Sequence, residues 1–168
     1  MTVLNIHKRK IHKPKEQVSQ IFRTLATQND LIWPGENWPA IRFRDGLKVG
    51  SKGGHGRIRY TIIDFQTGES IKFQFSKPDG FNGTHEFAIS KINDSETAIE
   101  HIISAKLSLR ATLLWVFVIR WLHDALIEDA FDKVENQFTE QKAHSEYNLW
   151  VKLLREVYKR KSFQTKHA

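Results

Sequence analysis

The stretch Ala111–Phe138, ATLLWVFVIRWLHDALIEDAFDKVENQF, contains neither glycine nor proline and decides how the rest of the chain is arranged. Its second half repeats apolar residues three or four positions apart, as an amphipathic helix does: Ile127, Phe131, Val134 and Phe138. Its first half, Leu113–Ile119, is apolar all round, which is typical of a helix buried on more than one side. A membrane span needs about 20 apolar residues, and Arg120, His123 and Asp124 interrupt this stretch too early. The pattern predicts one long buried helix.

The residues before this helix alternate between apolar and polar, as strands do. We expect a first strand over Thr2–His12 and then an amphipathic helix over Lys15–Leu25, which begins after Pro14. Short turns containing glycine, asparagine or aspartate separate the segments that follow, so these segments are expected to pair as antiparallel strands with one apolar face. The five segments are Ile41–Arg44, His55–Phe65, Glu69–Ser76, Gly83–Ile92 and Glu96–Leu109.

A sheet with one apolar face must bury that face, and the long helix is the available cover. Bending the sheet round the helix leaves a cavity wherever side chains do not fill the space. Strand parity and helical spacing predict a common core formed by Phe73, Phe87, Ile99, Ile103, Phe117 and Val134.

The segment Gln28–Ala40 contains two Trp–Pro pairs and a glycine, and it cannot be a regular element. Trp33 and Trp38 therefore lie in a loop. Tryptophans in such a loop either close the edge of a core or line the mouth of a pocket, and the sequence leaves both interpretations open.

Composition bounds the class of protein. At 168 residues, with 40% hydrophobic and 27% charged residues, the chain suits one globular domain, which we expect over residues 1–140, followed by a tail over residues 141–168. Cysteine is absent, and the basic N-terminus lacks the apolar core and cleavage site of a signal peptide, so a cytoplasmic location is expected. Residues 1–15 and 141–168 each carry +5 of the net +7, which leaves −3 for the body. Because this body is mildly acidic, no nucleic-acid partner is expected.

The tail contains a second amphipathic segment, His144–Lys161, which predicts a helix with one apolar stripe and one basic face. Such a helix can pack on its own domain, join two copies into a homodimer, or lie on an anionic membrane surface. We expect packing within the protein or its dimer, with Trp115 and Trp150 in contact, because a large exposed stripe promotes aggregation. The stripe is Tyr147, Trp150, Val151, Leu154, Val157 and Tyr158, and the basic residues are Lys152, Arg155, Lys159, Arg160 and Lys161.

The order of elements resembles the START and birch-pollen-allergen superfamily of helix-grip proteins, also called SRPBCC. The resemblance covers roughly residues 3–139 and rests on Ile11–Val18, the two Trp–Pro pairs and the long helix. Three shorter stretches resemble an uncharacterised bacterial branch: Gly54–Tyr60, Gly83–Phe87 and Leu122–Leu126. The resemblance implies an α+β helix-grip fold, in which a curved antiparallel sheet wraps around the long C-terminal helix and leaves a cavity between them. Members bind lipids, sterols, hormones or polyketides there, and some are cyclases, aromatases or dehydratases.

Two histidines, His85 and His101, lie on the apolar faces of neighbouring expected strands. Antiparallel neighbours approach within ~5–8 Å between Cβ atoms, so the two imidazoles are expected to meet inside the protein. Histidine can transfer protons near neutral pH, and Arg120, His123 or Asp124 could supply the partner that a buried imidazole needs. Alternatively, each imidazole is hydrogen-bonded and simply fills space.

Three functions follow as hypotheses. The first is binding of a small hydrophobic or amphipathic ligand in the cavity between the sheet and the long helix. The alternative is a cyclase- or dehydratase-type enzyme that acts on a bound, polyketide-like carbonyl compound through His85 and His101 as catalytic residues. A second alternative is an interaction or membrane-surface protein that acts through the basic tail. The expected ligand-binding residues are Trp33, Trp38, Phe73, Phe75, His85, Phe87, His101, Arg120 and His123.

No metal and no cofactor are expected. His85, His101 and His123 could be assembled as ligands, but the sequence contains no closely spaced ligand pair. The glycine-rich run Gly50–Gly56 lacks the Gly-Lys-Ser/Thr of a phosphate loop and precedes a strand, so it is expected to be a hairpin turn. Without cysteine or a Gly-x-Ser-x-Gly motif, covalent hydrolysis has no candidate nucleophile.

Overall fold

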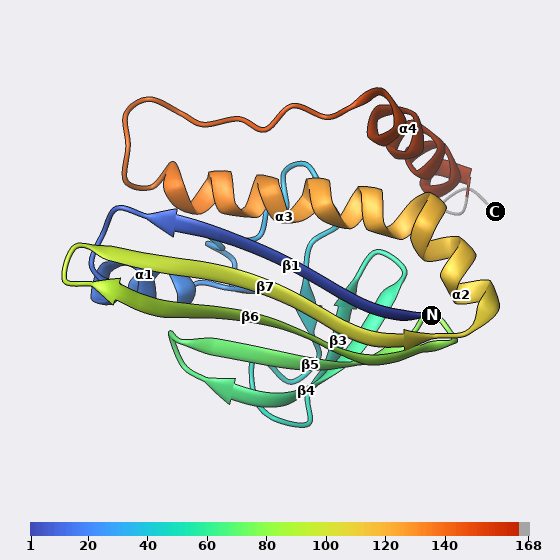
Figure 1. The fold of residues 1–168 in the computed structure, drawn as a ribbon, viewed down its shortest axis with the longest axis horizontal. Helices are drawn as coiled ribbons and strands as arrows, with labels where there is room; N and C mark the ends of the chain where they lie inside the picture. The colour runs from blue at the N-terminus through green and yellow to red at the C-terminus, as the bar shows by residue number, and fades with distance from the viewer. Residues whose placement is uncertain (165–168) are drawn as a thin grey trace.

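A computed structural model describes residues 1–164 of the chain, with side chains as far as Tyr158. It contains one curved antiparallel sheet of seven strands in the order β1-β7-β6-β5-β4-β3-β2, and a long helix lies across one face of this sheet (Figure 1). The strands are β1 Thr2–Ile11, β2 Arg42–Phe43, β3 Lys52–His55, β4 Ile58–Gln66, β5 Ser70–Lys77, β6 Phe81–Asn93 and β7 Glu96–Leu107. The predicted α+β helix-grip fold is confirmed.

The glycine-rich run differs from its prediction, because it contains a strand as well as a turn. Gly53 and Gly54 lie within β3, which pairs with β2 on one side and with β4 on the other. A Cβ atom on Gly54 would lie 2.0 Å from the carbonyl oxygen of Ile58. The glycines are therefore needed because the backbones approach closely within the sheet as well as at the turn.

The long helix is continuous from Leu109 to Glu135 and consists of α2 Leu109–Leu114, the π-helical turn η1 Trp115–Ile119, and α3 Arg120–Glu135. It begins two residues before its predicted start, because the side chain of Ser108 accepts a hydrogen bond from the backbone nitrogen of Ala111 and so caps the helix. The expected last strand correspondingly ends at Leu107 instead of Leu109. The shorter helices are α1 Lys15–Phe22 and α4 Leu149–Gln164.

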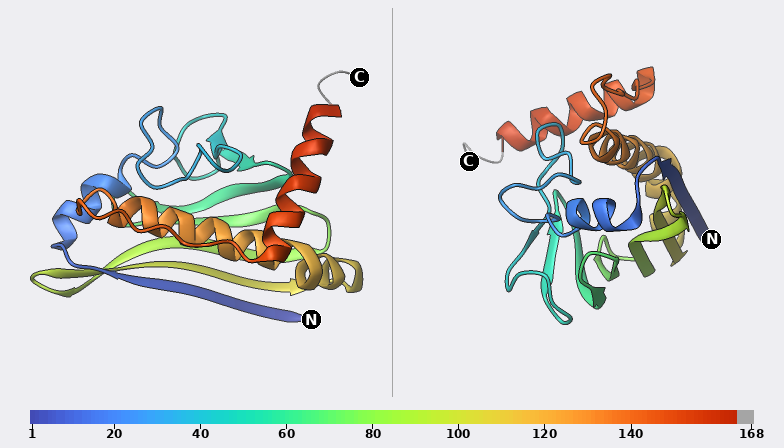
Figure 2. Two further views of the ribbon diagram at one scale, coloured as in Figure 1. Left: turned by 90° about the horizontal axis from the view of Figure 1, so that it is seen from above. Right: turned by 90° about the vertical axis from the view of Figure 1, so that its left-hand side faces the viewer.

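The main core lies between α3 and the concave face of the sheet (Figure 2). Four of the six residues predicted for a common core lie in it, namely Phe73, Phe87, Ile99 and Val134. Ile103 is also buried, but it belongs to a second cluster around Trp115. The prediction for Phe117 is wrong, because its side chain is 58% exposed. On the π-helical turn only Trp115 is fully buried, so this apolar stretch covers the sheet with one face and presents the other to solvent.

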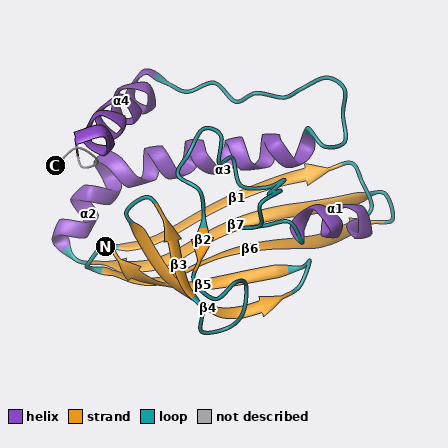
Figure 3. Ribbon diagram, turned by 180° about the vertical axis from the view of Figure 1, so that it is seen from behind, coloured by secondary structure: helices purple, strands orange, loops and turns teal. Residues whose placement is uncertain are grey.

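The tail folds back over α3 before α4 begins, five residues later than predicted (Figure 3). The hydroxyl of Tyr147 donates a hydrogen bond to Asp129, and the indole nitrogen of Trp150 donates to the carbonyl of Phe117 at 3.0 Å. Trp150 thus binds the backbone two residues after Trp115. Within the predicted stripe, Val151 and Leu154 are buried, but Trp150 and Val157 are each 42% exposed. The side chains of Lys159, Arg160 and Lys161 lie outside the described residues.

Candidate functional site

The predicted pair of histidines is brought together on the concave face of the sheet. His85 on β6 and His101 on β7 are diagonal neighbours, and the Nδ1 atom of His85 lies 3.3 Å from the Nε2 atom of His101. Both side chains are buried. The ring of His85 is stacked against Phe73 and Phe75, with centroids 4.5 and 4.7 Å away. These imidazoles therefore belong to a packed aromatic interior.

The pair is part of a longer series that crosses the sheet, here called the histidine row. From β1 the rings of His7, His123 and His101 follow one another at centroid distances of 5.6 and 4.9 Å. Beyond His85, the ring of Tyr60 lies 4.6 Å away, and its hydroxyl is 3.1 Å from the Nδ1 atom of His55. The members are His7, His123, His101, His85, Tyr60 and His55.

The two ends of the histidine row differ in charge. Burial lowers the pKa of His85 and of His101 well below 6.5, and it lowers the pKa of His55 to about 3. Burial also opposes protonation of His7, but hydrogen bonds to Asp124 and Glu128 outweigh it and raise the pKa of His7 to about 9. The row is therefore cationic beside β1 and neutral in its interior at pH 7.

Three ring nitrogens of the row have no hydrogen-bond partner among the described residues. They are the Nε2 atom of His85, the Nδ1 atom of His101 and the Nε2 atom of His123, and each is buried. Buried polar atoms are nearly always paired with protein or water. The interior of this fold thus has hydrogen-bonding capacity that the surrounding residues do not use.

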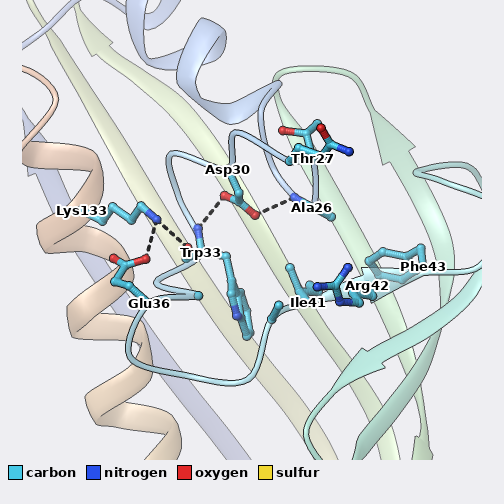
Figure 4. Close-up of a pocket in the computed structure, with 12 residues that line it drawn as sticks. Ala26, Thr27, Asp30, Trp33, Glu36, Ile41, Arg42, Phe43 and Lys133 are labelled. Atoms are coloured by element: carbon cyan, nitrogen blue, oxygen red, sulfur yellow. Dashed lines mark hydrogen bonds and ion pairs between the residues drawn. The ribbon is translucent and has the colours of Figure 1, made fainter.

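A first hollow, of about 690 Å³, is lined by the segment 26–43, which ends in β2, and by Lys133 from α3 (Figure 4). Asp30 fixes this segment, since its carboxylate accepts hydrogen bonds from the backbone nitrogens of Ala26 and Trp33, both at 2.7 Å. The Nζ atom of Lys133 on α3 donates to the carbonyl of Trp33 and to Glu36, both at 2.9 Å. The loop that contains the Trp–Pro pairs is thus tied to the long helix at the edge of the hollow.

A second hollow, of about 680 Å³, lies on the other side of β2 and shares Ala40, Arg42 and Phe43 with the first. Its lining includes the inner end of the histidine row, His55 and Tyr60. No acidic residue is among the residues that line it. Five cationic residues line it: Arg42, Arg44, Lys52, Arg59 and Lys77.

The predicted ligand-binding residues do not line one common cavity. Trp33 lines the first hollow, although its own side chain is buried. Trp38 instead donates from its indole nitrogen to Asp129 at 2.7 Å and lies under the guanidinium of Arg155. The interior residues, which line neither hollow, are Phe73, Phe75, His85, Phe87, His101 and His123.

Arg120 does not join the histidines as expected. Its guanidinium lies over the ring of the neighbouring Trp121, at 4.8 Å from the ring centroid. The other two helix residues named as possible partners do join the row, because His123 lies beside His101 and Asp124 contacts both His123 and His7. Glu128, one turn further along the helix, also contacts His7.

Sequence reasoning missed the cationic lining and the outer end of the row. The sequence predicts His55 and Tyr60 on a single strand and a turn over Gly50–Gly56, whereas the structure has a hairpin of β3 and β4 that positions His55. His7 and Asp124 are 117 positions apart, and only the antiparallel pairing of β1 with β7 beneath α3 brings them together. A signal was present in the alternation of Asn5, His7 and Arg9, three polar residues on the same face of the first strand.

The sequence matches no family model and no curated protein. A solution NMR structure of a protein from Thermobifida fusca superposes with a TM-score of 0.63 at 10% identity, over 85% of this chain and 99% of that chain. Norcoclaurine synthase from Thalictrum flavum, in complex with dopamine and hydroxybenzaldehyde, gives 0.61 at 11% identity, over 84% of this chain and 90% of that chain. A conserved protein of unknown function from Enterococcus faecalis gives 0.59 at 13% identity, over 97% of this chain and 86% of that chain.

The chain shares the helix-grip fold with these proteins. Identities of 10 to 13% establish the fold alone. The resemblance to one bacterial branch stays a prediction, as do the roles of the individual histidines. No helix among the described residues is long and apolar enough to cross a membrane.

Proposed function

We propose that the protein binds a small amphipathic molecule with an anionic group, and that this group is held in the second hollow. The observation that carries the proposal is the charge of the lining, where five cationic residues and no acidic one surround the space. Three of these five cations already have partners, because Lys77 pairs with Asp79 at 2.7 Å, Arg44 lies 3.9 Å from Asp45, and Arg59 donates to the carbonyls of Gly56 and Ile58; Arg42 and Lys52 are therefore the residues to test. Arginine is suited to bind a carboxylate or phosphate through two parallel hydrogen bonds.

Aromatic side chains beside these cations suit the apolar part of such a molecule. Phe43 lines both hollows, and its ring is stacked on Phe73 with centroids 5.7 Å apart. Tyr60 forms part of the wall of the second hollow. Because the hollows share Phe43, an apolar chain bound at one could extend towards the other. Ligand sites are typically concave and largely apolar, with a few polar groups that fix orientation.

The relatives in fold support small-molecule binding in general terms. Norcoclaurine synthase was solved with dopamine and hydroxybenzaldehyde, so this fold can hold small aromatic molecules. The cyclase- or dehydratase-type alternative through His85 and His101 requires a substrate to reach these two buried imidazoles, which line neither hollow. Binding at the cationic lining requires no such rearrangement, and we therefore prefer it.

The proposal is tested by calorimetric titration with laurate, using dodecylamine as a probe of equal length and opposite charge. We expect saturable binding of one laurate with micromolar affinity and much weaker binding of the amine. The double variant Arg42→Glu/Lys52→Glu should weaken laurate binding at least tenfold, which corresponds to about 1.4 kcal/mol. The matched control is Lys106→Glu, an exposed cation on β7 far from the lining. Equal affinity for both probes, or equal loss in the control, would contradict the proposal.

A second candidate function is contact with an anionic membrane. It is favoured by an apolar surface at the N-terminal end of the long helix. We call this surface the end face. On α2 and η1 its residues recur at helical spacing and point outward, and Leu109 is 82% exposed. On α4, Leu149 is 84% exposed. The end face consists of Leu109, Leu113, Val116, Phe117, Leu149, Trp150 and Leu153.

Charge favours a lipid surface over a second copy of the chain as the partner of this face. The segment 108–121 carries Arg110 and Arg120 and no acid, and α4 carries five basic residues against Glu156. Two such faces would repel one another across a twofold axis, whereas anionic lipids complement them. Exposed tryptophan and phenylalanine beside arginine and lysine are typical of interfacial helices.

Sedimentation with vesicles tests this second candidate. We expect binding to vesicles of phosphatidylcholine with a quarter phosphatidylglycerol, and weak binding to phosphatidylcholine alone. Leu113→Ser/Phe117→Ser should abolish it, whereas Leu4→Ser/Ile6→Ser, which removes two exposed apolar residues from β1, should not. Concentration-dependent dimers that the first variant dissociates would instead assign the end face to self-association.

A further inference from the structure

We propose that His7, His123 and Asp124 form a binding site for a divalent transition-metal ion such as Zn²⁺. One ligand atom from each residue lies within 4.8 Å of the other two. His7 comes from the middle of β1, and His123 with Asp124 comes from the second turn of α3, so the site joins the sheet to the helix that covers it. Two imidazoles and a carboxylate are ligands that Zn²⁺ and its neighbours in the first transition row accept.

Two of the three separations between these atoms are close to those that a bound ion requires, and the third, between His7 and His123, is no more than 4.8 Å. Ligand atoms at about 2.0–2.1 Å from a tetrahedral ion lie about 3.3 Å from one another. The Oδ1 atom of Asp124 lies 3.0 Å from the Nε2 atom of His7 and 3.4 Å from the Nδ1 atom of His123. An ion can therefore take the place of the protons that these atoms now share, with only small movements of the three side chains.

The groups around His7 and Asp124 are arranged as they are around known metal ligands, whereas the Nε2 atom of His123 has no partner among the described residues. The other ring nitrogen of His7, Nδ1, lies 2.9 Å from the Oε1 atom of Glu128, and the guanidinium of Arg9 holds the second oxygen of Glu128 at 2.6 Å. Metal-bound histidines almost always donate their second N–H to a carboxylate or carbonyl in this manner. Asp124 is oriented in turn by the side-chain amide of Asn5, which donates to Oδ1 at 3.2 Å.

An independent observation is the unused hydrogen-bonding capacity beside the three ligands. The Oδ1 atom of Asn5 and the Nδ1 atom of His101 are buried and unpartnered among the described residues, and the side chain of His101 is only 2% exposed. The ring of His101 lies 4.9 Å from the ring of His123. Three protein ligands leave a fourth position for water, and unpartnered acceptors beside the site could receive hydrogen bonds from such a water.

This site is separate from the second hollow and from the end face, so it is tested on its own. The experiment uses the full chain without an affinity tag, freed of metal by a chelator, and titrated with CoCl₂ and with ZnCl₂. We expect one equivalent of Co²⁺ to produce the intense visible absorption of a four-coordinate ion, and one equivalent of Zn²⁺ to displace it. His7→Gln and Asp124→Asn should each abolish the stoichiometric signal.

Three further variants separate binding at this site from binding elsewhere on the chain. Glu128→Gln leaves the three ligands in place and should weaken the affinity 10- to 100-fold, as the loss of an outer carboxylate does. His12→Gln and His144→Gln, which replace histidines outside the site, should leave the affinity unchanged. In the wild-type protein, which avoids any doubt about the folding of variants, Zn²⁺ should shift the imidazole ¹⁵N resonances of His7 and His123. Loss of metal binding in His12→Gln or His144→Gln would overturn the proposal. So would the absence of stoichiometric binding to the wild-type chain.

Discussion

Replacing His85 by phenylalanine should make the protein less sensitive to acid than the wild type. The imidazole is 6% exposed and stacked between Phe73 and Phe75, so a phenyl ring suits the same space. Burial first, and then the nearby His55 and His123, lower the pKa of His85 in the folded protein well below 6.5. As the pH falls, the unfolded chain therefore binds a proton at this position before the folded protein does.

The magnitude follows from linkage. Above pH 6.5 both states are neutral at His85, and the histidine carries no penalty from protonation. At pH 5 the unfolded histidine is one and a half pH units below its pKa, and its protonation favours the unfolded state by about 2 kcal/mol. The phenylalanine variant lacks this term. Its free energy of unfolding, measured relative to the wild type, should thus increase by about 2 kcal/mol between pH 8 and pH 5.

Urea unfolding of both proteins at the two pH values, with a chelator present, measures this difference. Taking the difference cancels the titrating groups that do not interact with His85, including His7, whose pKa of about 9 gives it the opposite dependence. His101 does not cancel in this way, since its pKa is lowered by burial and, to a smaller extent, by His85. Ile71→Val serves as a control in the same core, and its effect on stability should be equal at both pH values. If the difference in free energy of unfolding between the two proteins is the same at pH 8 and pH 5, the folded protein protonates His85 as readily as the unfolded chain does. The conclusion that the interior of the histidine row is neutral would then be wrong.

Three further predictions concern the fold and the tail. Phe131→Ala, in the main core beneath α3, should lower the free energy of unfolding by about 3–5 kcal/mol in chemical denaturation. Tyr147→Phe removes the hydroxyl that donates to Asp129 and should cost about 1–3 kcal/mol, because the carboxylate loses a partner; unchanged stability would show that this contact does not hold the tail. Gly54→Ala should reduce the melting temperature, since φ is +152° and the new methyl group would lie 2.0 Å from the carbonyl oxygen of Ile58; a variant as stable as the wild type would contradict the described β3–β4 pairing.

The fold was predictable because its signals are local. The long helix contains no glycine or proline, and the strands alternate with period two between recognisable turns. Residue propensities, the hydrophobic periodicity and the need to cover the apolar face of the sheet therefore all indicate the same fold. Errors occurred where a tertiary contact decides. Because its stretch is apolar all round, the sequence predicts burial of Phe117, but this part of the helix packs on the sheet mainly through Ala111 and Trp115, and α4 covers the opposite face in part. Gly53 and Gly54 read as a turn because glycine disfavours strands, yet here it permits close backbone approach.

The candidate site was predictable in part. The meeting of His85 and His101 follows from strand parity and neighbouring position, which the sequence supplies. The cationic lining does not follow, because Arg42, Lys52 and Arg59 come from three different strands, β2, β3 and β4, whose register depends on the hairpin at Gly56. Likewise, no sequence spacing connects His7 with Asp124, since the first strand and the last long helix meet only after the sheet has formed.

Binding of an anionic amphiphile beside β2 is the central claim, and mapping laurate onto the backbone amides by NMR tests it most directly. Titration of ¹⁵N-labelled protein should give saturating shifts that cluster in β2, β3 and the start of β4, including Arg42, Gly54 and Tyr60. Amides of α2 and α4 should change little. Shifts that do not saturate, or that cluster on the end face around Phe117 and Trp150, would contradict the claim.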